Sequence, residues 1–338
     1  MRRAEKTKTS TRPGRVPAGP PGAASRAVDR ITPRAIQVTL GAIWLLDGAL
    51  QLQPYMFSHH FLTDVLLPVA DGQPAFVASL IRASDQLVAP HLAVWNGLFA
   101  ALQVGLGVGL LVPRTVKPAL VASFAWSALV WCVGEGFGGL LSGSATPLTG
   151  APGAVLLYAL VGILAWPTHR PAGASITSSG PVGDLGGRLA WALLWAGSGV
   201  LCLVPANWRH GAIASTLASG SAGEPAVLAS LDRHAANLVA GQDLGVAIAL
   251  AVLQLAVAAG VLGRWHRNVW VAAGAALAVV FWVLGQDLGG LLTGQTTDPN
   301  TGPLLVLLAL CLVEAQPRAA HLPAASAAHA AGAQLANA

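Results

Sequence analysis

The chain repeats itself after 151 residues. A shift by that distance, without any gap, superimposes five landmark pairs: Trp44 on Trp195, Pro54 on Pro205, Gln103 on Gln254, Trp131 on Trp282, and Pro152 on Pro303. The most similar segments, WCVGEGFGGLLSG at 131–143 and WVLGQDLGGLLTG at 282–294, are identical at 7 of 13 positions. Because a repeat of fixed period determines the architecture before any local element does, the sequence predicts a fused tandem duplication.

Composition indicates that the solvent of this duplicated unit is lipid. Hydrophobic residues make up 54% of the chain and charged residues 10%, whereas about a quarter of the residues of a soluble domain are charged. A helix needs roughly 20 apolar residues to cross a bilayer core of about 30 Å. Four such windows fit each half, so we expect an all-α membrane protein of eight spans, at 35–56, 91–112, 117–135, 153–166, 186–207, 242–263, 268–286 and 304–313. Thr301 is an alternative start for the last span.

Basic residues predict the orientation, because cytoplasmic loops gather Lys and Arg. With the amino terminus inside, 16 of the 19 basic residues fall on the cytoplasmic side, and Arg82, Arg209 and Arg233 fall outside. An even number of spans per repeat makes the two halves parallel. We therefore expect a plasma-membrane protein with both termini in the cytoplasm. The 3 Lys against 16 Arg favour a bacterial, GC-rich source.

The predicted domain order follows from these spans. It comprises a disordered basic cytoplasmic tail (1–34), the first membrane repeat (35–167), a cytoplasmic linker (168–185), the second membrane repeat (186–314) and a disordered Ala-rich tail (315–338). Most of the positive charge lies in the first tail, which suits anionic lipid headgroups. The expected partner is therefore the lipid bilayer and not nucleic acid.

Two pairs of outer segments recur in both halves. Residues 74–88 and 225–239 are identical at 8 of 15 positions and carry apolar residues at helical spacing, which predicts amphipathic helices at the outer interface. The alternative is a cap helix packed on its twin. The glycine-rich connectors at 134–153 and 285–304 predict a folded lid. Their formal GxGxxG match does not indicate a nucleotide site, since no strand precedes it.

Polar residues within the spans are the candidates for function, because each is costly in hydrocarbon. Asp47 and Gln51 share one face of the first span, and their counterparts Ser198 and Cys202 cannot carry the same charge. Gln103 and Gln254 lie mid-span, where we expect the twofold relation to let them approach each other or hydrogen-bond across the bundle. The other candidates, towards the outer mouth, are Glu135, Gln286, Asp287 and His91. Glu135 could equally lie among headgroups.

Catalytic and metal sites are not predicted. His59, His60 and His210 form a small outer group, but no Cys, Met or carboxylate stands at ligand spacing, so we expect no metal. The three cysteines fall inside spans and lack CxxC spacing, which argues against a dithiol relay. No complete set of acid, base and nucleophile is visible, which argues against an enzyme.

One family resemblance follows from the first span and the loop pattern. The segment GAIWLLDGALQLQP at 41–54, a long outer loop after it and a short basic inner loop resemble the DoxX/DoxD family and its MauE-like relatives. The resemblance implies a small membrane subunit associated with quinol oxidation, thiosulfate oxidation or thiol homeostasis, with a quinone as the implied cofactor. This chain departs from the family in being duplicated and in lacking paired membrane cysteines, so no catalytic residue is carried over.

Two functional interpretations remain from the sequence. The preferred one is a non-catalytic membrane subunit or scaffold of a DoxX-like redox or cell-envelope complex, docking a membrane or extracytoplasmic protein partner. The alternative is a small-solute or ion permease with a path along the pseudo-twofold axis. A permease predicts an Asp47-lined hydrated cavity at mid-membrane, whereas a scaffold predicts a dry core with its polar groups paired.

Overall fold

The computed structural model describes residues 31–168, 175–219, 223–263 and 266–313. The predicted tails lie almost wholly outside these residues, as does part of the predicted linker. Throughout the described ranges the elements are helices and short helical turns, without strands. The all-α prediction is therefore confirmed.

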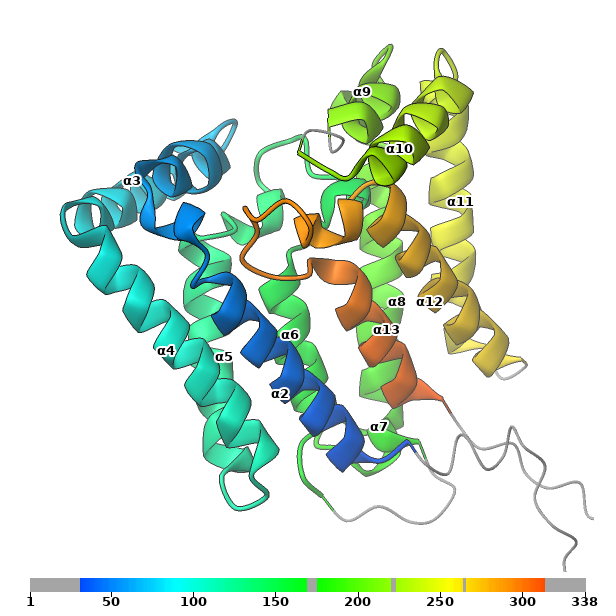
Figure 1. Cartoon of the computed structure of the whole chain (residues 1–338). Coiled ribbons are helices and arrows are strands. Elements are labelled where there is room, and N and C mark those ends of the chain that lie inside the picture. Colours follow the sequence, from blue (N-terminus) through cyan, green and yellow to red (C-terminus); the bar gives the residue numbers. More distant parts are fainter. Residues whose placement is uncertain (1–30, 169–174, 220–222, 264–265, 314–338) are drawn as a thin grey trace, which may run out of the picture.

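The first half contains α2 (Pro33–Leu50), α3 (Ala75–Val88), α4 (Leu92–Leu111), α5 (Val116–Val133) and α6 (Ala154–Leu164). The second half contains α8 (Gly183–Cys202), α10 (Ala226–Val239), α11 (Asp243–Leu262), α12 (Arg267–Leu284) and α13 (Thr301–Leu312), with the short α7 (Ile176–Ser179) and α9 (Ala212–Ser219). Figure 1 shows α4 and α5 at one edge, α11 and α12 at the opposite edge, and α6 and α13 between them. The last helix thus begins at Thr301, the alternative start.

Five helices are long and apolar enough to cross a membrane: the continuous segment Ala75–Leu111, which joins α3 to α4, and then α5, α8, α11 and α12. They are consistent with a multi-pass membrane protein. By contrast, α6 has 11 residues and α13 has 12. At about 1.5 Å per residue these two helices are roughly 17 Å long, which is short of a bilayer core of about 30 Å.

Small residues hold α2 against α4. A Cβ atom on Gly41 would lie 3.0 Å from the Gly107 carbonyl oxygen, and one on Gly48 would lie 2.6 Å from a Val104 methyl carbon. Glycine at such a crossing lets two helix backbones approach closely. The same packing recurs in the second half, where a Cβ on Gly199 would lie 3.1 Å from the Ala251 carbonyl oxygen. Asp47, next to Gly48, is therefore carried by a tightly packed helix pair.

The two connectors pack against the opposite half of the chain. Residues 145–148 are buried, and Gln286 donates a hydrogen bond from Nε2 to the Pro147 carbonyl at 3.4 Å. Asn300 likewise donates to the Thr149 carbonyl at 3.5 Å. The connectors therefore fold into the protein over the ends of α6 and α13, in the manner of the predicted lid.

The outer helices divide their apolar residues between two sides. In α3, Val77 and Ile81 are fully buried, whereas Phe76 and Leu87 are 63% and 61% exposed. The matching residues of α10, Val227 and Leu238, are 78% and 66% exposed. Figure 1 shows α3 and α10 on opposite sides of the molecule, so the alternative of a cap helix packed on its twin is wrong. The exposed apolar stripes suit a membrane interface.

The crossing of α2 and α4 can be tested with a single methyl group. Gly48→Ala should lower the free energy of unfolding by about 1–3 kcal/mol, because the new Cβ overlaps Val104 and approaches the Ala100 carbonyl oxygen. Gly105→Ala is the matched control on α4, since nothing lies within 4 Å of its added methyl group. Thermal unfolding in detergent measures both. Equal melting temperatures for the two variants would show that the close crossing is absent.

Candidate functional site

The first half contains a cavity of about 180 Å³ among α2, α4, α5 and α6. Its walls are mainly apolar and include five aromatic rings, those of Trp44, Phe61, Phe99, Trp126 and Tyr158. Its polar lining consists chiefly of Asp47, Gln51, Gln103, Glu135 and Asp298. Four of these five are candidates from the sequence, so the structure brings separate spans together at one site.

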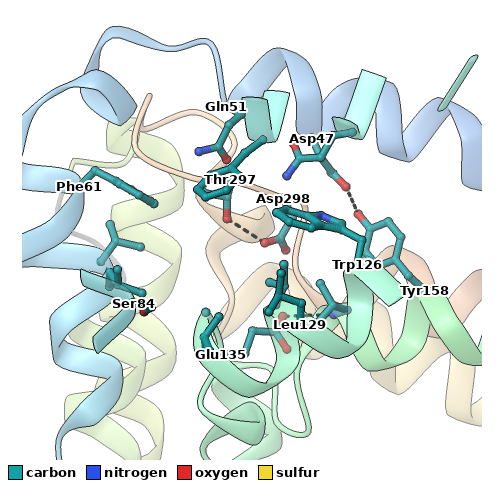
Figure 2. Close-up of a pocket in the computed structure, with 18 of the residues that line it drawn as sticks. Asp47, Gln51, Phe61, Ser84, Trp126, Leu129, Glu135, Tyr158, Thr297 and Asp298 are labelled. Carbon is teal, nitrogen blue, oxygen red and sulfur yellow. Dashed lines mark hydrogen bonds between the residues drawn. The ribbon is translucent and has the colours of Figure 1, made fainter. Parts of the chain in front are cut away.

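Asp47 projects from α2 into this cavity and is 2% exposed. The Tyr158 hydroxyl of α6 donates a hydrogen bond to Asp47 Oδ2 at 2.5 Å, and Figure 2 marks this bond. The Trp44 ring lies 4.3 Å from the Tyr158 ring, centre to centre, and its indole nitrogen donates to the Ser123 hydroxyl at 3.1 Å. Asp47 Oδ1 has no hydrogen-bond partner within the structure. One carboxyl oxygen is thus fixed, and the other is free for a ligand.

Two amides lie beside the carboxyl group, with opposite pairing. Gln51 donates to the Asn96 side-chain oxygen, and Asn96 donates back to the Gln51 carbonyl at 2.8 Å. Gln103 is 7% exposed and lines the cavity, but its Oε1 atom has no partner. Gln51 is therefore structurally satisfied, whereas Gln103 offers the cavity a free acceptor.

Glu135 closes the far end of the cavity and caps α6. Its Oε1 atom accepts a hydrogen bond from the Val155 backbone nitrogen at 3.1 Å, which satisfies one of the free donors at a helix start. Burial, together with the nearby Asp298 carboxyl, raises the pKa of Glu135 to about 8. Glu135 Oε2 has no partner. A carboxyl group at this position can therefore exchange a proton near neutral pH.

Asp298 reaches the cavity from the connector of the second half. Figure 2 shows it between Asp47 and Glu135. Its carboxylate accepts hydrogen bonds from the Asn300 backbone nitrogen at 2.8 Å and from the Thr297 hydroxyl at 3.0 Å. Burial raises the pKa of Asp298. Three carboxyl groups from two halves of the chain therefore share one small space.

The structure corrects the gapless alignment of the two connectors. The Trp131 indole donates to the Pro152 carbonyl at 2.9 Å, and the Trp282 indole donates to the Pro299 carbonyl at 2.8 Å. Pro299 and not Pro303 therefore takes the place of Pro152, and the second connector is shorter by 303 − 299 = 4 residues. Surface connections tolerate such deletions, which a gapless comparison cannot reveal.

With this correction, the second half has a reduced version of the same site. Asp47 pairs with Ser198, Tyr158 with Leu305, and Asp298 with Ala151. Ser198, Leu305 and Ala151 line a space of only about 10 Å³ in the second half. The second copy therefore has no carboxyl group at any of these three positions and almost no room.

Gln254 lies outside both of these spaces. It is fully buried and donates to the Cys202 sulfur and the Leu250 carbonyl, each at 3.1 Å. Because α4 and α11 lie at opposite edges of the molecule (Figure 1), the expected approach of Gln103 and Gln254 is wrong. Contacts between α6 and α13, and not between the second spans, join the halves.

The remaining sequence candidates lie elsewhere. Gln286 and Asp287 line a second, polar depression of about 300 Å³, where burial and the neighbouring Asp232 raise the pKa of Asp287 to about 7. His91, His59 and His210 are exposed, and His60 pairs with Asp64 at 3.3 Å. Within the described part of the chain, no group of three or more His, Cys, Asp or Glu residues is placed to hold a metal ion.

Two residues of the cavity were not foreseen. Tyr158 is one of only two tyrosines and stands alone in an otherwise aliphatic span, a signal that could have marked it as a partner for Asp47. Asp298 carried no usable signal, because the gapless alignment placed it opposite Pro147. No protein-family model, curated protein or solved structure matches the chain.

The hydrogen bond to Asp47 predicts a loss of stability in Tyr158→Phe. The variant removes the single donor to a buried carboxyl group, which should cost about 1–3 kcal/mol of unfolding free energy. Tyr55→Phe is the matched control, because the Tyr55 hydroxyl bonds Asp64 at the surface. Thermal unfolding of both variants measures the difference, and a larger loss in Tyr55→Phe would contradict the assignment.

The raised pKa of Glu135 predicts a pH dependence of stability. The folded protein keeps the proton up to about pH 8, whereas the unfolded chain releases it near 4.5. The free energy of unfolding should therefore fall as pH rises through this window and level off above it. Glu135→Gln keeps the cap on α6 without a charge, as Gln286 does on α13.

This variant should remove the decline and be more stable than the unaltered protein at pH 9, by a few kcal/mol on the order of 1.4 per pKa unit. Melting temperatures from pH 5 to 9 measure the effect, with Asp71→Asn as a control at an exposed carboxyl. Parallel pH curves for Glu135→Gln and the unaltered protein would show that Glu135 is not protonated in the fold.

Proposed function

We propose that the chain is an eight-span membrane protein built from two parallel four-helix repeats. Three helix pairs support this: α3 with α10, α4 with α11, and α5 with α12 begin and end 151 residues apart. The pair α6 and α13 begins 147 residues apart, as the shorter connector requires. The short α6 and α13 reach membrane depth together with connectors that are buried in protein, the setting in which irregular backbone is tolerated there.

We propose a plasma-membrane location with both termini in the cytoplasm. The helix ends that carry Arg34, Lys117, Arg188 and Arg267 lie on one side of the molecule, opposite α3, α9 and α10 (Figure 1). The start of α2 and the end of α13 lie on that same basic side. The positive-inside rule makes this side cytoplasmic.

The function that the geometry supports best is that of a small-solute permease coupled to protons, with its binding site in the first half. The observation that carries this proposal is the 180 Å³ cavity, into which Asp47 presents an unpaired carboxyl oxygen. A scaffold would instead pair off its intramembrane polar groups. Glu135, which titrates near neutral pH, supplies a second group for proton exchange.

A non-catalytic subunit of a DoxX-like redox or envelope complex is the second candidate. It is favoured by the second half, whose equivalent space is closed, and by the exposed apolar stripes of α3 and α10, which could contact a membrane partner. In that case the cavity of the first half would hold a quinone ring. The two candidates differ in whether solute crosses the membrane.

Transport distinguishes the candidates. Purified protein in proteoliposomes should accumulate radiolabelled small solutes when a pH gradient is imposed, tested with amines, organic acids and polyols. Asp47→Asn should abolish the pH-dependent part of uptake, because an amide cannot exchange a proton. Ser198→Ala is the matched control in the second half. Absence of uptake, or an unchanged pH profile in Asp47→Asn, would leave the subunit role as the better interpretation.

A further inference from the structure

We propose that the ligand of the first-half cavity is a small organic cation, an ammonium group with apolar substituents. The inference rests on the proposed solute-binding function and specifies its substrate class. It follows from the charge, the walls and the size of the cavity.

The charge of the cavity lining is one-sided. Asp47, Glu135 and Asp298 contribute three carboxyl groups, and no lining residue is Arg, Lys or His. Asp47 is 2% exposed with Oδ1 unpaired, and Gln103 is 7% exposed with Oε1 unpaired. Buried carboxylates require a compensating positive charge. The protein supplies none here, so a cationic ligand completes the site.

The walls favour a cation whose charge is spread over alkyl groups. Five aromatic rings face the same space as the three carboxyl groups, with Trp44 packed on Tyr158 at 4.3 Å. Aromatic faces attract cations, Trp most strongly, and they recognise quaternary ammonium groups in particular. A bare metal ion would need several oxygen ligands converging on one point, and the described residues hold no such group.

The size of the cavity sets an upper limit on the ligand. Its volume of about 180 Å³ is close to that of an apolar cavity of roughly 150 Å³ that accepts benzene. A trimethylammonium group with a short substituent therefore fits, whereas a long or branched cation does not.

A quinone ring fits the volume but not the polar groups. Its carbonyl oxygens need hydrogen-bond donors, and the Tyr158 hydroxyl already donates to Asp47. The remaining groups that lack partners, on Asp47, Glu135 and Gln103, are oxygen acceptors. Acceptors repel a carbonyl oxygen and attract a cation.

The site should occur once per chain. At the equivalent place in the second half, Ser198, Leu305 and Ala151 line a space of about 10 Å³. Neither the charge nor the room for a cation is present there.

Binding of choline and of its uncharged isostere 3,3-dimethyl-1-butanol tests the inference. The two probes have nearly the same shape, so isothermal titration of the full chain in nanodiscs isolates the effect of charge. We expect one choline site per chain and about tenfold or weaker binding of the isostere. Equal affinities, or no choline binding by folded protein, would overturn the proposal. Displacement of choline by a short-chain quinone with higher affinity would favour the quinone instead.

Charge-removing variants locate the site. Asp47→Asn and Asp298→Asn should each weaken choline binding about tenfold or more while leaving the isostere unchanged. Asp298 lies in a connector, so Asp298→Asn keeps the test available should Asp47→Asn fail to fold. Asp287→Asn is the control, because this carboxyl group lies outside the cavity. An equal loss in Asp287→Asn would show that choline binds elsewhere.

The pH dependence provides an independent measurement. The charged or titratable groups facing Glu135 are Asp298 on the second connector, Asp47 on α2 and Tyr158 on α6. Ionisation of Glu135 adds negative charge, so choline affinity should rise between pH 6 and 9, and Glu135→Gln should flatten this rise. A fall in affinity over this range would contradict the inference.

Binding and transport fail separately. Choline binding without uptake by proteoliposomes would support the cation site and contradict the permease. Uptake of neutral solutes that depends on Asp47, without preference for choline over its isostere, would support the permease and overturn the cation site.

Discussion

A carboxyl group buried within a membrane-spanning helix imposes the main constraint on this molecule. Asp47 receives one hydrogen bond, from Tyr158, and its second oxygen faces a cavity instead of a partner. An uncompensated charge in hydrocarbon is costly, so such a group persists where a cavity, a proton or a ligand accommodates it. The surrounding architecture meets this requirement: glycine contacts fix α2 on α4, Glu135 anchors α6, and the second connector closes the space.

The two halves share a framework but not a site. Trp131 and Trp282 hold their connectors through the same indole-to-carbonyl hydrogen bond, and Glu135 and Gln286 bond the start of α6 and α13 in the same way. These contacts concern folding alone. The chemistry differs, since three carboxyl or hydroxyl groups of the first half face serine, leucine and alanine in the second. One copy can therefore serve packing while the other binds a ligand.

Sequence reasoning succeeded where the signal was local. The all-helical fold follows from hydropathy, and Asp47, Gln103 and Glu135 were found because polar residues in apolar windows are conspicuous. It failed where the answer depended on three-dimensional placement. A repeat indicates symmetry but not which helices meet at the axis, so Gln103 and Gln254 were wrongly expected to approach each other. A four-residue deletion in a glycine-rich connector hid the position of Asp298.

The exchange of connectors explains why the halves belong to one chain. Asp298 of the second connector enters the cavity of the first half, while Pro147 and Ala151 of the first connector line the closed space of the second. A four-helix half by itself would lack the residue that completes its own site. Fusion also lets the copies diverge, because a carboxyl group gained by one connector then faces only one cavity. A symmetric dimer of single halves would carry the same charge twice, with twice the cost of burying it.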